Sequence, residues 1–262
     1  MKKTLIALVV AASAAVSGSA MAWSPAGSGG EVSVGGILSV IGDQNPWTVA
    51  VGASVHTLNA SLKHGEQEVS IMLPKNIPVI GMQVKDGDFM GHEGVSPKLS
   101  YGKGVDLSKL SNGVAPVHLD IKSSDGSVIG SMDTQLKIAA EGMEASFNSG
   151  AFDYRRHMLF ADKPGEMFVG GVAQNAEGVM KDEKAAEDFM HSMFSDIASH
   201  WSSHGSNLSA PGAVAPVDLG RKYNGMYASG FTAGDTVTIK LNKPVEHETA
   251  WQAVLPILVS YA

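Results

Sequence analysis

The chain has 262 residues, a formal net charge of −7 and no cysteine. A negative balance argues against a nucleic-acid-binding role, because such a role needs a basic stripe. The absence of thiols excludes cysteine catalysis, iron–sulfur ligation and most structural zinc sites. We therefore expect the fold to depend on burial and hydrogen bonding alone.

The first 22 residues have the pattern of a secretory signal peptide. Two lysines precede the apolar run 5–16, and small residues follow at 20–22. We expect cleavage before Trp23. The apolar run is too short for a membrane span, and no later stretch reaches that length. The sequence thus predicts an exported, soluble chain with no membrane span.

Short segments rich in Val, Ile and Thr alternate with turns that contain many of the 30 glycines. This pattern is typical of antiparallel sheets. The pair Asp125 and Gly126 predicts a hairpin turn, because glycine adopts a positive φ at low cost. We predict an all-β antiparallel sandwich with strands at 31–40, 47–55, 68–73, 77–84, 117–122, 128–138, 235–242 and 251–261.

One segment, 182–205, departs from the strand pattern. Its apolar residues follow one another in steps of one, three and four, which fits a single face of an amphipathic helix. We predict that this helix ends near Gly205 and belongs to an insertion at about 140–215. The apolar face consists of Ala186, Phe189, Met190, Met193, Phe194, Ile197 and Trp201.

Three polar residues on the predicted helix could bind a metal. Asp196, His200 and His204 are spaced four residues apart, so they line up on its polar face. Two histidines one turn apart can hold a transition metal. The alternative, a polar helix end with His204 in the last turn, is favoured because no further ligand is visible. No metal and no cofactor are therefore predicted.

The sequence holds no nucleophile elbow, P-loop or H-E-x-x-H motif, so no catalytic residue and no enzymatic activity are predicted. Arg155 and Arg156 beside Tyr154 could grip an anionic or sugar ligand. Adjacent strand residues point to opposite faces, so at most one arginine faces any site, and a surface ion pair is favoured. Trp201 could stack on a sugar, but a core position is favoured.

Both ends of the predicted exported chain carry strand patterns. On the terminal strand, alternate residues share one face, while Pro256 lies on the other and lacks the amide hydrogen of an inner strand. Near the start, a Gly/Ser-rich lead precedes a second alternating strand. The two strands either pair with each other within one chain or await partners. The residues of the two faces are Val32, Val34, Gly36 and Leu38, and Trp251, Ala253, Leu255, Ile257, Val259 and Tyr261.

The signal peptide, the V-x-V-G-G-x-L segment at 32–38, the W-x-A-x-L-x-I-x-V-x-Y strand at 251–261 and the lack of cysteine together resemble the cysteine-free fimbrial subunits of the Fae type. The likeness is greatest to minor subunits. It implies an immunoglobulin-like (pilin) sandwich over 41–262 that lacks its final strand. In this family a periplasmic chaperone lends a strand, and the N-terminal extension of the next subunit, here 23–40, replaces it.

The resemblance also implies roles for residues. Val32, Val34 and Leu38 would insert as the donor strand, and Gly36 would allow close backbone approach. The strand that the chaperone and the outer-membrane usher recognise would present Leu255, Ile257, Val259 and Tyr261. We expect a structural or minor subunit of a bacterial surface fimbria that reaches the cell surface through the periplasm and supports cell adhesion beside other fimbrial subunits. The alternative is an adhesin that binds host glycans through the helix-containing insertion.

Overall fold

The computed structural model describes residues 45–262. The predicted signal peptide and the predicted strand 31–40 lie outside the described residues. The predicted donor-strand residues that fall there are Val32, Val34, Gly36 and Leu38.

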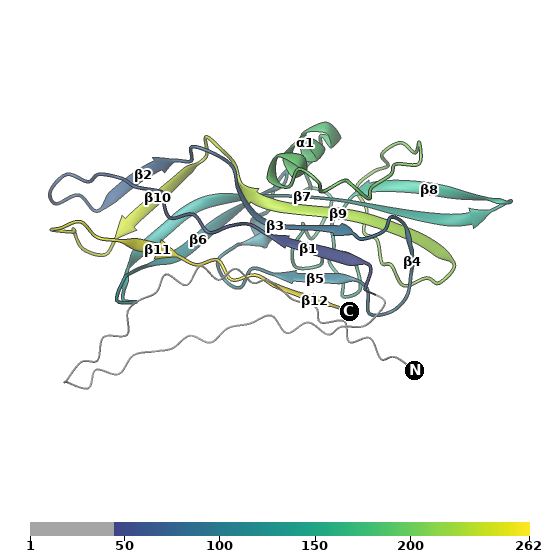
Figure 1. Ribbon diagram of the computed structural model, residues 1–262, viewed down its shortest axis with the longest axis horizontal. Helices are drawn as coiled ribbons and strands as arrows, with labels where there is room; N and C mark the ends of the chain where they lie inside the picture. Colours follow the sequence, from purple (N-terminus) through teal and green to yellow (C-terminus); the bar gives the residue numbers. More distant parts are fainter. Residues whose placement is uncertain (1–44) are drawn as a thin grey trace, which may run out of the picture. The chain divides into compact units, whose positions relative to one another are not determined.

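The described chain is mostly antiparallel β-structure with one α-helix, which confirms the all-β prediction (Figure 1). The strands are β1 (Trp47–Val51), β2 (Glu68–Met72), β3 (Ile77–Val84), β4 (Phe89–Met90), β5 (Pro97–Ser100), β6 (Val114–Ser123), β7 (Val128–Asn148), β8 (Ala151–Met158), β9 (Arg221–Phe231), β10 (Thr236–Leu241), β11 (Trp251–Ala253) and β12 (Leu258–Tyr261). The helix α1 is Glu183–Met193, and a 3₁₀ turn spans Leu107–Lys109.

The large sheet has the strand order β1-β3-β9-β7-β10-β2. β7, 21 residues long, organises it. The first part of β7 pairs with β6 and β10, and the second part pairs with β8 and β9. A small second sheet joins β12 to β5. The Asp125–Gly126 hairpin between β6 and β7 is confirmed, with Gly126 at φ +85°.

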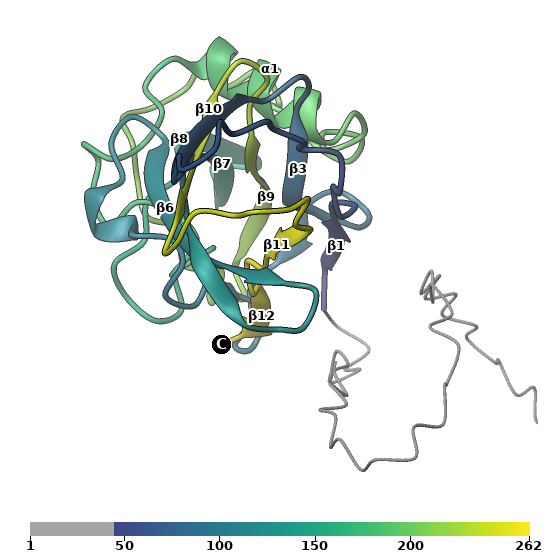
Figure 2. The same cartoon turned by 90° about the vertical axis from the view of Figure 1, so that its left-hand side faces the viewer.

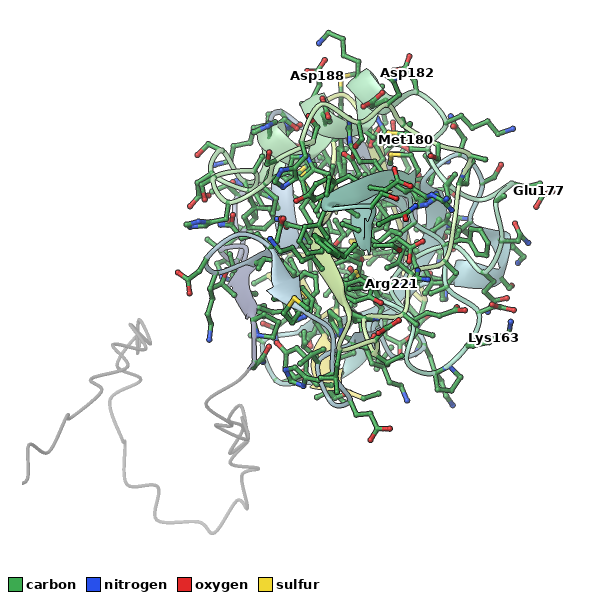
Figure 3. The ribbon with its side chains drawn as sticks, turned by 90° about the vertical axis from the view of Figure 1, so that its right-hand side faces the viewer. Lys163, Glu177, Met180, Asp182, Asp188 and Arg221 are labelled. Carbon is green, nitrogen blue, oxygen red and sulfur yellow. The ribbon has the colours of Figure 1, made fainter. Side chains whose placement is uncertain are left out.

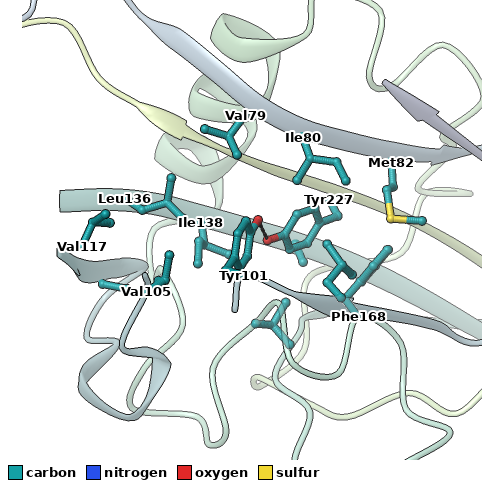
Figure 4. Packing of buried hydrophobic residues seen from close by; sticks show 14 of the residues in the cluster. Val79, Ile80, Met82, Tyr101, Val105, Val117, Leu136, Ile138, Phe168 and Tyr227 are labelled. Atoms are coloured by element: carbon teal, nitrogen blue, oxygen red, sulfur yellow. Dashed lines mark hydrogen bonds between the residues drawn. The ribbon is translucent and has the colours of Figure 1, made fainter. Parts of the chain in front are cut away.

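The main core lies against the inner face of the large sheet (Figure 4). At its centre the hydroxyl oxygens of Tyr101 and Tyr227 lie 2.6 Å apart. Tyr101 also donates to Ser229, and Tyr227 donates to the carbonyl of Gly171. Burial raises the pKa of Tyr101 to about 12, so both phenols stay neutral and act as hydrogen-bonding core residues. The network fixes the loop after β5 and the Gly171 loop against β9.

Helix α1 packs on the opposite face of the large sheet, with buried residues Ala186, Phe189, Met190 and Met193. The side chain of Asp182 accepts a hydrogen bond from the amide of Ala185 and caps the first turn. Figure 3 shows Asp182 and Asp188 at the outer surface where the helix lies. The helix sits close to the sheet, because a Cβ on Gly81 would come within 2.7 Å of the Phe194 ring.

The predicted helix over 182–205 is wrong beyond Met193. Phe194 has extended backbone angles, φ −137° and ψ 104°, and its amide closes the last turn on the carbonyl of Met190. Its ring fills the space over Gly81. The following serine and aspartate residues favour turns, because their side chains compete with helical hydrogen bonds. The apolar face continues without the helix, since Ile197 is buried and Trp201 contacts the same cluster.

Candidate functional site: an open edge of the sandwich

The C-terminal segment lines the core without being enclosed by it. Its odd-numbered side chains are all partly buried, and its even-numbered side chains are all exposed, as the period of two predicts. The partly buried set, which packs against the main core, is Trp251, Ala253, Leu255, Ile257, Val259 and Tyr261.

This segment is not the single strand that the sequence predicted. β11 pairs with β6, β12 pairs with β5, and the residues between them lie outside any strand. Pro256 lies in this interruption, where its missing amide hydrogen removes a ladder donor. Within residues 45–262, β11 and β12 each have one strand neighbour, so their other edge is free.

β1 has a free edge as well. It pairs only with β3 among the described strands, with Trp47 opposite Val84, Val49 opposite Met82 and Val51 opposite Ile80. Directly opposite residues share a face. The β3 residues are at most 2% exposed, but exposure along β1 rises from 3% at Trp47 to 42% at Val49 and 62% at Val51. Core-facing valines are therefore uncovered along the outer edge of β1.

The two free edges meet at one end. Burial raises the pKa of the Tyr261 phenol, and the nearby Asn45 side chain lowers it by less. The amide of Trp47 donates to Asn45 Oδ1, and the last residue, Ala262, exchanges backbone hydrogen bonds with Ser96. The chain runs away from this end along β1 and toward it along β12. In Figure 2 none of the described strands lies between β1 and β11. We call β1, β11, β12 and the residues 254–257 the open edge.

The two adjacent arginines lie on opposite faces, as predicted. Arg155 is exposed, and its Nη2 lies 3.8 Å from Asp153 Oδ2. Arg156 contradicts the expected surface ion pair: it is 6% exposed and donates to the buried Glu141. Sequence reasoning missed Glu141, because a glutamate within a strand pattern gives no sign that its face is covered.

The metal-site geometry considered for Asp196, His200 and His204 is wrong, because α1 ends before all three. His204 Nε2 lies 2.9 Å from Asp88 Oδ2, and its ring stacks on Tyr154 at 4.0 Å. His200 contributes its backbone carbonyl, which accepts from Asn224. The backbone carbonyl of Asp196 accepts from the amide of Ser199, so the three residues make separate contacts in the loop after α1.

Among residues 45–262, no helix is both long and apolar enough to cross a membrane. The fold and its open edge define an all-β, pilin-like sandwich. The chain matches the family described as "Fimbrial, major and minor subunit" over residues 1–262, so it belongs to that fimbrial family. It is accordingly a structural subunit of a surface fimbria, which assembles with other fimbrial subunits.

Curated relatives agree with this assignment. The chain is 27% identical to "K88 fimbrial protein AB" and 29% identical to "F41 fimbrial protein", both from Escherichia coli. It is 28% identical to "K88 fimbrial protein AD" from the same organism. Each comparison covers 100% of this chain and 100% of the relative.

Proposed function

We propose that this chain is a minor structural subunit whose open edge is completed by a strand from another polypeptide. A periplasmic chaperone supplies that strand first, the outer-membrane usher receives the complex, and the segment 23–40 of a neighbouring subunit takes its place in the fibre. The observation that carries the proposal is the exposure of Val49 and Val51, 42% and 62%, opposite fully buried partners on β3.

The chemistry of the open edge fits an added β-strand. Free main-chain groups along β11 and β12 can pair with an extended segment, and alternate side chains of that segment can fill the spaces between edges. Val32, Val34 and Leu38 have this alternation, and Gly36 allows close approach. The chaperone and usher would recognise the same partly buried terminal face, formed by Leu255, Ile257, Val259 and Tyr261.

Deleting residues 23–40 tests the proposal. The shortened chain should still bind the chaperone, because its own open edge is intact, but it should fail to complete a neighbour. Polymerisation is measured by electron microscopy and by the ladder of heat-labile multimers on gels. Val34→Asp should reproduce the defect, while Ser33→Asp, on the opposite face of the segment, should assemble. Normal fibres from the shortened chain would refute the donor-strand role.

A second candidate function, binding of host glycans, is favoured by a row of aromatic rings. Phe147 and Phe152 face each other across β7 and β8 at 5.2 Å, Tyr154 lies 6.1 Å from Phe152, and His204 stacks on Tyr154. Lys222 Nζ lies 4.5 Å from the centre of the Phe152 ring. We call the four rings the aromatic ridge. Aromatic faces carry partial negative charge and attract the polarised C–H groups of sugar rings.

A glycan array with the donor-strand-completed subunit tests this second function. Phe147 is 62% exposed, so Phe147→Ala should reduce any glycan signal at least tenfold with little change in folding. Met72→Ala is the matched control, because it also removes an exposed apolar side chain, at a position far from Phe147 in the sequence. If the array binds no glycan, or if both variants give equal signals, the glycan-binding function is rejected and only the structural function remains.

A further inference from the structure

Glu141, in the middle of β7, is a fully buried acid with an incomplete set of partners. It is 0% exposed, and its Oε1 accepts from Arg156 Nε at 2.7 Å and lies 2.5 Å from Arg156 Nη2. Its other oxygen, Oε2, is buried and has no hydrogen-bond partner. A buried carboxylate oxygen without a donor is costly when ionised, whereas a protonated carboxyl carries no charge.

The helix brings two more carboxylates to the same arginine. Arg156 Nη2 lies 2.5 Å from Glu183 Oε1 and 3.4 Å from Glu187 Oε1, both on α1. One oxygen of each glutamate lies within 4.8 Å of those of the other two. Arg156 therefore links two strands of the sheet to the helix. We call Glu141, Arg156, Glu183 and Glu187 the arginine latch.

The charges of the arginine latch do not balance. Three ionised carboxylates against one guanidinium leave an excess of negative charge in a partly buried site. The charged groups that face Glu141 are Arg156 from β8 and Glu183 and Glu187 from α1. Burial raises the pKa of Glu141 to about 7, more than Arg156 lowers it, and the two helix carboxylates raise it further. Glu141 therefore keeps its proton to a higher pH than a solvent-exposed glutamate does.

We propose that proton binding by Glu141 controls how firmly α1 and the segment after it are held on the sheet. When Glu141 is neutral, the guanidinium is left to the two helix carboxylates, and the helix docks tightly. When Glu141 is ionised, it competes for Arg156 and repels Glu183 and Glu187, and docking weakens. This inference goes beyond strand exchange and does not rest on it.

The direction of the pH effect follows from the raised pKa of Glu141. Between its ordinary range and about pH 7, the folded protein binds a proton that the unfolded chain releases, so this stabilisation is complete below that range and decreases as the pH rises across it. It is lost as the pH rises through about 7. Docking of α1 should therefore be firmer at about pH 5.5 than at about pH 8.

The loop after α1 should respond with the helix. Arg156 Nη1 donates to the carbonyl of Ser206, and its guanidinium carbon lies 5.9 Å from the centre of the Trp201 ring. His204, which completes the aromatic ridge, lies between these two contacts in sequence. The arginine latch therefore connects protonation in the sheet to the position of one ridge residue.

Hydrogen–deuterium exchange of the full chain tests the arginine latch. After correction for the intrinsic pH dependence of exchange, protection of the 183–193 amides should fall about tenfold or more from about pH 5.5 to about pH 8, while β10 amides change little. Glu141→Gln, which stays neutral, should remove the difference. Glu144→Gln is the matched control, because Glu144 lies on the same strand but pairs with the half-exposed Arg221. An unchanged pH response in Glu141→Gln, or no response in the unmodified chain, would overturn the inference.

A second variant covers the case in which Glu141→Gln fails to fold. Glu187 is on the helix surface with 38% of its side chain exposed, so Glu187→Gln should fold normally. Removing this neighbouring negative charge should lower the pH at which α1 protection is half lost by about half a unit or more. An unshifted midpoint would mean that Glu141 does not control docking.

Discussion

Replacing Arg156 with methionine is expected to lower the free energy of unfolding by about 3–5 kcal/mol at about pH 8 and above, where Glu141 is ionised in the unmodified chain. Methionine keeps a flexible apolar stem but removes the guanidinium. Glu141 would then have no partner for either oxygen, because Oε2 already lacks one. Glu183 and Glu187 would face Glu141 with no cation between them. Urea unfolding measures the loss as a lower midpoint at unchanged slope.

Two comparisons make the Arg156 result specific. Arg155→Met should change stability by about 0.5 kcal/mol or less, because Arg155 is exposed and 3.8 Å from its partner. The double variant Arg156→Met with Glu141→Leu should recover most of the loss, since it removes the unpaired acid. The Arg156→Met penalty should also shrink at about pH 5, where Glu141 is protonated. Equal stability of the two arginine variants would contradict a latch role.

Three of the predicted strands match described strands closely. The segment 77–84 coincides with β3, and 235–242 and 68–73 differ from β10 and β2 by a residue or so at the ends. β9 was not predicted from the sequence. Its residues 223–230 are all buried, because α1 covers one face and the main core covers the other, so apolar and polar residues do not alternate along it. Asn224 within it gave a polar signal that only tertiary partners, Asp88 and the carbonyl of His200, explain.

The sequence predicted the C-terminal side of the open edge better than the β1 side. A period of two placed the terminal apolar face, because side-chain alternation is local. It could not show that β11 and β12 pair with different strands, since pairing depends on positions more than a hundred residues away. In sequence, the exposed valines of β1 resemble those of any other strand, because the absence of a neighbouring strand on one side leaves no mark on the local sequence. Glu141 was missed because the sequence around it does not show that helix α1 covers its face of the sheet.

Strand addition at the open edge must overcome a large ordering cost. Val32, Val34 and Leu38 at about 1.5–3 kcal/mol each contribute about 5–9 kcal/mol when buried. Ordering an eight-residue strand costs about 8–16 kcal/mol at about 1–2 kcal/mol per residue. The balance must come from main-chain hydrogen bonds and from covering the open edge itself, including Val49 and Val51. We therefore expect a single inward-facing charge on the added strand to abolish the complex.

The absence of cysteine permits a direct test of this strand addition by engineered disulfides. One copy carries Val34→Cys in its N-terminal segment. A second copy, shortened by residues 23–40, carries one cysteine at a position between 257 and 260. Side chains that share a face on neighbouring strands come close enough for a disulfide, whereas those on opposite faces do not. Mild oxidation and a non-reducing gel then report which positions meet.

We predict an alternating result for the mixed copies. Disulfide-linked pairs should form with Ile257→Cys or Val259→Cys, whose side chains face the core, and not with Leu258→Cys or Ser260→Cys, whose side chains face outward. Equal linkage at all four positions, or no linkage at the two inward ones, would contradict completion of the open edge by the N-terminal segment of another copy.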